Sequence, residues 1–173
     1  MKSGKTDQAL QVLSKSSQRQ PRNSDLALRT AMVYEVSQQW EQAKNAYERV
    51  LALDSTNATA QNNLAWLLAE HAGNIDVALK LAQQAKERSK DNVNVTNTIG
   101  WIYYKKNSYQ MALQYLRESA TKEPGNPMYQ YHLGMVYLKL GKNGEARQAL
   151  EKALKLDPKF PQAGEVKKML AEI

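Results

Sequence analysis

Apolar residues recur at helical spacing, three, four and seven positions apart, along most of the 173-residue chain. Ile99, Gly100 and Tyr103 share one face of a predicted helix, and Ala112 and Leu116 share the matching face of the next. Short runs with Gly, Pro or Asn separate such segments and interrupt the helical pattern. In the run 124–127, Asn126 is expected to cap the next helix, and Pro127 suits its first position. The pattern therefore predicts an all-α chain of short amphipathic helices joined by tight turns.

The helical pattern also repeats along the chain. A small residue marks the first helix of each predicted pair, and another marks the second helix. The first-helix markers are Ala31, Ala65, Gly100 and Gly134. The second-helix markers are Ala9, Ala43, Ala78, Ala112 and Ala146. Because small side chains allow two helices to cross closely, the repeat predicts a series of helical hairpins.

One of the repeats is a residue longer than the others. The markers are 34 residues apart, except for a step of 35 from Ala65 to Gly100 and from Ala43 to Ala78. The additional residue therefore lies between Ala65 and Ala78, and we place it in the stretch 71–75. An insertion there lengthens a turn and leaves the helix registers intact.

This pattern resembles the tetratricopeptide repeat (TPR) family, whose 34-residue motif carries Leu-Gly, Tyr, Ala, a large apolar residue and Pro. One copy resembles the motif at Leu133, Gly134, Tyr137, Ala146, Leu150 and Pro158. The first aromatic of the family motif is absent from all four copies, which have Ala27, Gln61, Thr96 and Gln130 there. The resemblance implies a right-handed α-solenoid of antiparallel helical hairpins, the TPR superhelix.

The resemblance covers nearly the whole chain and divides it into six segments. Residues 1–23 resemble the second helix of a truncated repeat, and residues 161–173 resemble a C-terminal capping helix. Four TPR units are expected between them, at residues 24–57, 58–92, 93–126 and 127–160. The unmatched front helix leads us to expect a fragment of a longer array.

Two stretches, 62–68 and 98–101, resemble bacterial TPR proteins linked to exopolysaccharide export and surface-protein sorting. That resemblance implies a part of a larger bacterial scaffold. It leaves two compartments open, the cytoplasm and the periplasm, with membrane association through a parent chain.

A second stripe of residues follows each first helix, away from its predicted core face. In TPR proteins the first helices line the concave face, so these stripes are expected to lie in a peptide-binding groove. Aromatic members would anchor a ligand and asparagines would bind its backbone. Alternatively, some of the aromatics pack between neighbouring first helices and contact no ligand. The predicted groove residues are Asn62, Trp66, Asn97, Trp101, Tyr104, Tyr131, Met135 and Leu138.

Composition limits the chemistry that the chain can perform. It has no cysteine, which excludes disulfides and cysteine-ligated metals. Its formal net charge is +7, but basic and acidic residues mostly alternate and no aromatic–basic stripe accompanies them, so we expect no nucleic-acid partner. No apolar run is long enough for a membrane span, and the first five residues lead into no signal-peptide core.

No constellation of residues predicts catalysis. Ser3-Gly4-Lys5-Thr6 resembles the end of a phosphate loop but lacks the upstream glycine. His71 and His132 lie in different repeats without paired ligand spacing, and Glu35 and Glu70 are expected at a solvated edge. We therefore expect no catalytic residue, no metal and no cofactor.

The sequence thus favours a non-enzymatic module that binds a protein or peptide segment. The alternative is a structural scaffold that assembles through the ends of the array. In that case Leu10, Val12 or Leu13 of the front helix would pair with a second copy, giving a homodimer or a filament.

Overall fold

The computed structural model describes residues 3–71 and 73–173, and every regular element within them is an α-helix. The predicted all-α class is therefore confirmed. Met1 and Lys2 lie outside the described residues, as does Ala72 of the stretch expected to hold the insertion. The chain forms two compact units, residues 1–90 and 91–173. Within the described part, no helix is both long and apolar enough to cross a membrane.

The first unit contains one helix that is not part of a hairpin, followed by two hairpins. Helix α1 packs against α2, α2 pairs with α3, and α4 pairs with α5. Four residues separate the end of α4 from the start of α5, one more than separate α2 from α3. The helices are α1 (Ser3–Arg19), α2 (Ser24–Val36), α3 (Trp40–Leu53), α4 (Ala58–Glu70) and α5 (Ile75–Arg88).

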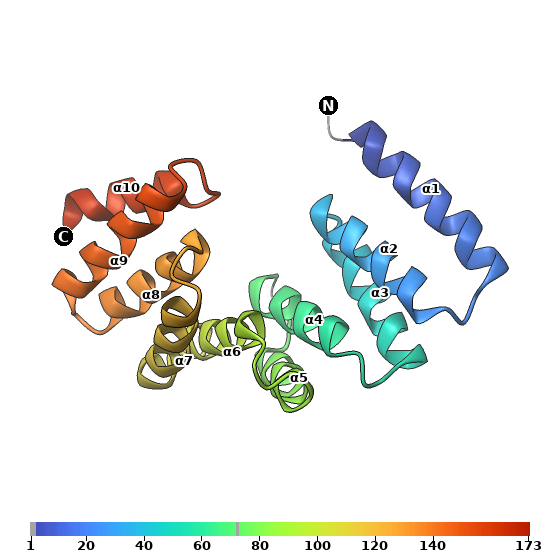
Figure 1. Cartoon of the computed structure of the whole chain (residues 1–173), viewed down its shortest axis with the longest axis horizontal. Coiled ribbons are helices and arrows are strands. Elements are labelled where there is room, and N and C mark those ends of the chain that lie inside the picture. Colours follow the sequence, from blue (N-terminus) through green and yellow to red (C-terminus); the bar gives the residue numbers. More distant parts are fainter. Residues whose placement is uncertain (1–2, 72) are drawn as a thin grey trace. The chain divides into compact units, whose positions relative to one another are not determined.

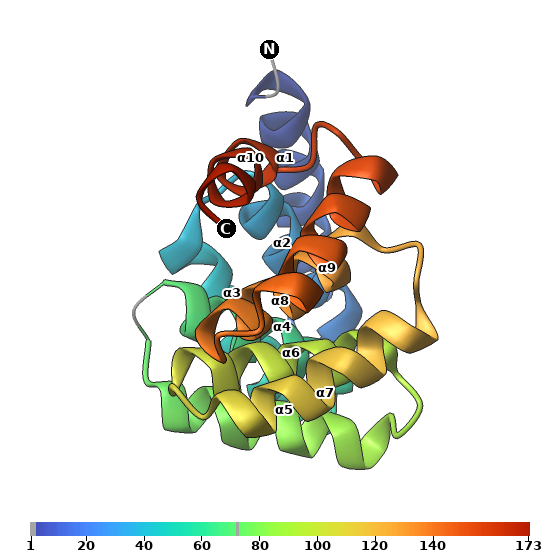
Figure 2. The same ribbon diagram turned by 90° about the vertical axis from the view of Figure 1, so that its left-hand side faces the viewer.

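The second unit contains two hairpins and a final helix. The two helices of a hairpin lie side by side, as α8 and α9 do in Figure 1 and Figure 2. The last helix, α10, packs on α9. The helices are α6 (Val93–Lys105), α7 (Tyr109–Lys122), α8 (Pro127–Lys139), α9 (Asn143–Leu156) and α10 (Ala163–Glu172).

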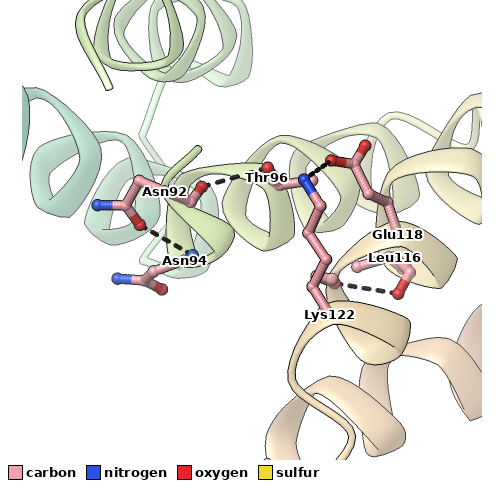
Figure 3. Close-up of polar contacts among 7 residues, drawn as sticks. Asn92, Asn94, Thr96, Leu116, Glu118 and Lys122 are labelled. Carbon is pink, nitrogen blue, oxygen red and sulfur yellow. Dashed lines mark hydrogen bonds and ion pairs between the residues drawn. The ribbon is translucent and has the colours of Figure 1, made fainter. Parts of the chain in front are cut away.

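The first helix of every hairpin begins after an asparagine N-cap. Asn92 Oδ1 accepts a hydrogen bond from the backbone N–H of Asn94 at 3.0 Å (Figure 3). It accepts a second one from the backbone N–H of Val95 at 3.3 Å. Such bonds satisfy N–H groups that lack a partner within the helix. The sequence predicts the cap Asn126 and Pro127 at the first helical position, and both are confirmed. The four caps are Asn23, Asn57, Asn92 and Asn126.

The small marker residues lie where the helices of a hairpin cross. The alanine markers of α3, α5, α7 and α9 are fully buried. At Gly100 and Gly134 there is no room for a Cβ atom, because it would lie 2.8 Å and 2.6 Å from the side chains of Leu116 and Leu150. A larger residue at either position would therefore force Leu116 or Leu150 to move.

A polar contact links three helices of the first unit. The buried Tyr47 of α3 donates a hydrogen bond from its hydroxyl to Glu35 of α2 and accepts one from Asn63 Nδ2 of α4, at 3.0 Å. Burial, followed by the Glu35 carboxylate, raises the pKa of Tyr47 far above its usual value. Tyr47 therefore stays neutral and available as a donor.

We expect Tyr47→Phe to lower the free energy of unfolding by about 1–2 kcal/mol, because Glu35 and Asn63 lose a partner while the ring packing is kept. Chemical denaturation of both proteins measures the difference. Asn63→Ala in the Tyr47→Phe background should then cost less than it costs in the wild type. An equal cost in both backgrounds would show that the two groups are not coupled.

Candidate functional site

Aromatic rings form a stack on the first helices of the second unit. The Trp101 ring of α6 lies 4.6 Å from the Tyr104 ring, with an angle of 5° between their planes. Its centroid is 4.2 Å from the His132 ring and 6.2 Å from the Tyr131 ring, both on α8. Tyr131 in turn lies 5.9 Å from Phe160. The stack thus joins α6 to α8 and to the segment before α10.

The predicted groove residues on α6 and α8, other than Asn97, differ in accessibility. Trp101 and Tyr131 are each only 5% exposed, whereas Tyr104, Met135 and Leu138 are half-buried. Trp101 and Tyr131 therefore pack between first helices, as the alternative interpretation of the sequence describes. The other three side chains keep surface that a ligand could reach. Contact of these five with a ligand stays a prediction.

A buried polar chain lies beneath the aromatic stack. Asn97 of α6 donates from Nδ2 to Ser119 Oγ of α7 at 3.0 Å, and Ser119 donates to the Leu116 carbonyl. Asn97 Oδ1 lies 2.8 Å from His132 Nδ1. Because Asn97 Oδ1 can only accept, Nδ1 of His132 carries the proton. Both polar ends of Asn97 thus have partners inside the protein, which favours a structural role over ligand binding.

His132 is uncharged in this environment. Burial, followed by the positive charge of Lys105, lowers the pKa of His132 to about 3. A neutral imidazole can stack on Trp101 and donate its Nδ1 hydrogen bond to Asn97 without the desolvation cost of a charge. The sequence predicts no metal or catalytic role for His132 and offers no other function. On α8, His132 stands one residue beyond Tyr131, the position that aligns with Asn97 in the 34-residue repeat, and this spacing is the signal that could have paired the two.

Charged side chains lie at the edges of the stack. Lys105 Nζ is 5.4 Å from the centre of the Trp101 ring, and the Tyr131 hydroxyl lies 3.4 Å from Glu165 Oε2 of α10. Burial, then the neighbouring Tyr109 and Glu165, raises the pKa of Tyr104. Tyr104 therefore remains a neutral hydroxyl on a surface bordered by a cation and an anion.

The first unit carries the other two predicted groove residues, both on α4. Asn62 is buried, and its Nδ2 donates to Asn63 Oδ1 at 3.2 Å. Asn62 Oδ1 has no hydrogen-bond partner among the described residues. Trp66, one turn further along α4, is half-buried. Ligand contact by Asn62, Trp66 and Asn97 also stays a prediction.

Among the described residues, no three or more His, Asp or Glu side chains lie close enough together to hold a metal ion. The side chains that do converge are aromatic, amide and hydroxyl groups. Such groups bind a ligand by stacking and hydrogen bonding.

Comparison with known proteins agrees with the helical-repeat architecture. The family described as "Tetratricopeptide repeat protein 21 C-terminal ARM domain" matches residues 1–168. Cellulose synthase operon protein C of Pseudomonas fluorescens (strain SBW25) is 25% identical over 170 residues, which are 94% of this chain and 13% of that protein. The chain spans between 13% and 32% of the length of the curated relatives it matches.

Solved structures with similar folds are TPR solenoids, which confirms the predicted fold class. The crystal structure of PilW, a "widely conserved type IV pilus biogenesis factor", has a TM-score of 0.77 at 17% identity, and the match covers 96% of this chain and 85% of PilW. The crystal structure of YrrB, "a TPR protein with an unusual peptide-binding site", has a TM-score of 0.70 at 21% identity, covering 95% and 84%. These similarities establish the fold of the chain, and the right-handed sense of the solenoid stays a prediction.

Proposed function

Because the chain belongs to the Tetratricopeptide repeat protein 21 C-terminal ARM domain family, we propose that it is a non-catalytic module that binds a protein or peptide segment on its first helices. The binding surface on the second unit consists of the accessible sides of Tyr104, Met135 and Leu138. Trp66 offers a similar half-buried indole on the first unit. The structural neighbour YrrB is described as having a peptide-binding site, which supports this assignment.

The observation that carries the proposal is the support beneath Tyr104. Its ring lies flat on the Trp101 ring, and the Trp101 ring also stacks with His132. His132 is in turn held by Asn97. A partly exposed aromatic ring on a fixed base loses little conformational freedom when a ligand binds, so more of its contact energy appears as affinity. Tyr104 is thus the best-prepared anchor of the predicted set.

The edges of the surface define the ligand further. Lys105 lies beside Trp101 and Glu165 beside Tyr131, so a segment with an apolar centre and charges of both signs would complement the surface. Trp101 and Tyr131 act in this proposal as the base of the surface. Asn97 lies beneath the surface and fixes His132 by a hydrogen bond.

We place the module within a larger bacterial scaffold linked to exopolysaccharide export. The support for this is the similarity to cellulose synthase operon protein C, of which the chain spans 13%. A short module in such a protein would hold a second component at a defined place, which requires no catalytic group in the module itself.

Capture from a bacterial lysate, followed by affinity measurement with the captured partner, tests the binding surface. Truncating Tyr104 and Leu138 to alanine should remove the partner, since one anchor residue contributes about 2 kcal/mol, or roughly 30-fold in Kd. The matched control truncates Met111 and Leu156, exposed apolar residues of the second helices α7 and α9. Equal capture by the Tyr104/Leu138 variant and the wild type would rule out this surface.

A further inference from the structure

The first unit contains a cavity of about 610 Å³ between α1, α2 and α3. Ala27, Thr30 and Tyr34 line it from α2, Ser17 lines it from α1, and Arg49 lines it from α3. Its volume lies within the range of about 300–1,000 Å³ that is typical of small-molecule sites. Three helices of one unit thus bound a space large enough for a small ligand.

The cavity does not lie on the face of α1 that a first helix covers in a hairpin. In the hairpin of α6 and α7, the first helix α6 approaches Leu116 closely and donates a hydrogen bond to Ser119. The repeat aligns these two residues of α7 with Leu13 and Ser16 of α1. Neither Leu13 nor Ser16 belongs to the lining of the cavity. A first helix placed before α1 in the same way would therefore leave the cavity open.

Two residues of α2 are smaller than most of their counterparts in the other first helices, which accounts for the free space. Ala27 and Thr30 stand where the other repeats have side chains that are buried in five of six cases. The counterparts are Gln61, Thr96 and Gln130 for Ala27, and Leu64, Ile99 and Leu133 for Thr30.

Arg49 makes a hydrogen bond that a glutamine makes in another repeat. Gln130 Nε2 donates to the Pro124 carbonyl, in the turn before α8, at 3.3 Å. The repeat aligns Pro124 with Pro21, and Gln130 with Ala27, whose side chain has no donor. The Pro21 carbonyl accepts instead from Arg49 Nη2, at 3.2 Å. This bond uses one of the five guanidinium N–H groups and holds the guanidinium beside the cavity.

The charge of Arg49 is not neutralised by the protein. Among the described residues, Arg49 forms no ion pair, and it is the only charged side chain that lines the cavity. The other polar groups of the lining are amides and hydroxyls, which both donate and accept hydrogen bonds. They include Ser14, Ser17 and Gln18 of α1 and Gln42 and Asn45 of α3. A complementary ligand therefore has one anionic group and several groups that donate and accept.

We propose that this cavity binds a sugar acid, a small ligand with one carboxylate and several hydroxyls. The carboxylate pairs with Arg49, because a guanidinium matches the geometry of a carboxylate. The hydroxyls bind the amides of Gln42 and Asn45 and the hydroxyl of Ser17. A peptide fits less well, because peptide sites generally offer a strand edge, an apolar groove for a helix or an aromatic groove. This cavity has helical walls, a mostly polar set of side chains and one aromatic residue, Tyr34.

Titration of the full 173-residue chain with D-glucuronate, followed by ¹H–¹⁵N correlation NMR, tests the proposal. The shift changes should saturate and should concentrate at cavity residues such as Ser17, Tyr34 and Asn45. Glucose lacks the carboxylate and acetate lacks the hydroxyls, so each should bind at least about tenfold more weakly. The absence of saturable glucuronate binding, or equal affinity for glucose or acetate, would overturn the proposal.

Variants of the chain locate the binding. Ala27→Gln introduces the residue of two other repeats, fills the cavity and should weaken glucuronate binding at least about tenfold. Arg49→Gln should weaken it as much by removing the charge. Ala52→Gln and Arg29→Gln, at exposed positions outside the cavity, should leave the affinity unchanged. Wild-type affinity of the Ala27→Gln and Arg49→Gln proteins would overturn the assignment to this cavity.

Two further measurements make the result unambiguous. Thermal unfolding followed by circular dichroism confirms that the variants fold, and Arg49→Gln, at an exposed position, decides the outcome if Ala27→Gln unfolds the chain. Tyr104→Ala/Leu138→Ala changes the second unit only and should bind glucuronate as the wild type does. Failure of the proposed function would therefore leave the glucuronate result unaffected.

Discussion

Gly134→Leu is expected to lower the free energy of unfolding by about 3 kcal/mol, because overpacking a well-packed core generally costs about 1–3 kcal/mol and occasionally more. Even a Cβ atom at this position would lie 2.6 Å from Cγ and Cδ2 of Leu150, and Leu150 is fully buried on α9. Leucine is a better helix former than glycine, which offsets at most about 1 kcal/mol of that cost. Urea denaturation of the two proteins measures the difference.

The same substitution at Gly144 provides the control. Gly144 lies in α9, and a Cβ atom there would contact nothing within 4 Å. Gly144→Leu should therefore leave the stability unchanged or raise it slightly. A loss at Gly144 as large as the loss at Gly134 would contradict the explanation based on close crossing.

A smaller residue at position 150 should reduce the loss of stability caused by a larger residue at position 134. Gly100 and Gly134 each face a leucine, whereas Ala65 stands at the equivalent place in the hairpin whose second helix carries Ala82. Gly134→Ala combined with Leu150→Ala should therefore cost less than the sum of the two single changes. Additive costs would show that the two positions are independent.

Acidification is expected to destabilise the protein through His132. The pKa of its imidazole is lowered to about 3 in the folded chain, against about 6.5 in the unfolded chain. The unfolded state therefore binds more protons between these values, and stability is lost as the pH falls below 6.5. Because each pH unit corresponds to 1.36 kcal/mol, moving from pH 7 to pH 5 should cost about 2 kcal/mol through this residue.

Urea denaturation at pH 7 and at pH 5 gives the size of this effect. His132→Gln keeps a polar group beside Asn97 and cannot titrate, so its stability should change much less between the two pH values. His71→Gln, at the exposed ring that stacks on Trp40, should keep the wild-type dependence. If His132→Gln and the wild type lose the same stability, the buried imidazole is not the source.

The hairpins were predictable because their determinants are local and repeat. The spacing of Gly100, Ala112 and Gly134 defines which helix faces must meet, and turn residues such as Asn126 and Pro127 define where a helix begins. These features depend on nearby residues only. The fold class and the cap at Asn126 therefore followed from sequence patterns alone.

Which side chains of the second stripe are buried by neighbouring helices could not be predicted in the same way. Helical periodicity places Trp101 and Tyr104 on a common side of α6, but it does not state which of them a neighbouring helix covers. That depends on Tyr131 and His132, some 30 residues further along the chain. The pairing of Asn97 with His132 has the same origin. Polar residues at such positions look alike in sequence whether they bind a ligand or each other.

The exposure of α1 also bears on how the chain folds during synthesis. Helix α1 leaves the ribosome before α2, and none of its residues with a described side chain is fully buried in the folded chain. An isolated helix of 17 residues is only marginally stable in water. At about 5–20 residues per second, α2 follows within a few seconds. During that interval the segment containing Leu10, Val12 and Leu13 is an unfolded apolar stretch that a chaperone can recognise.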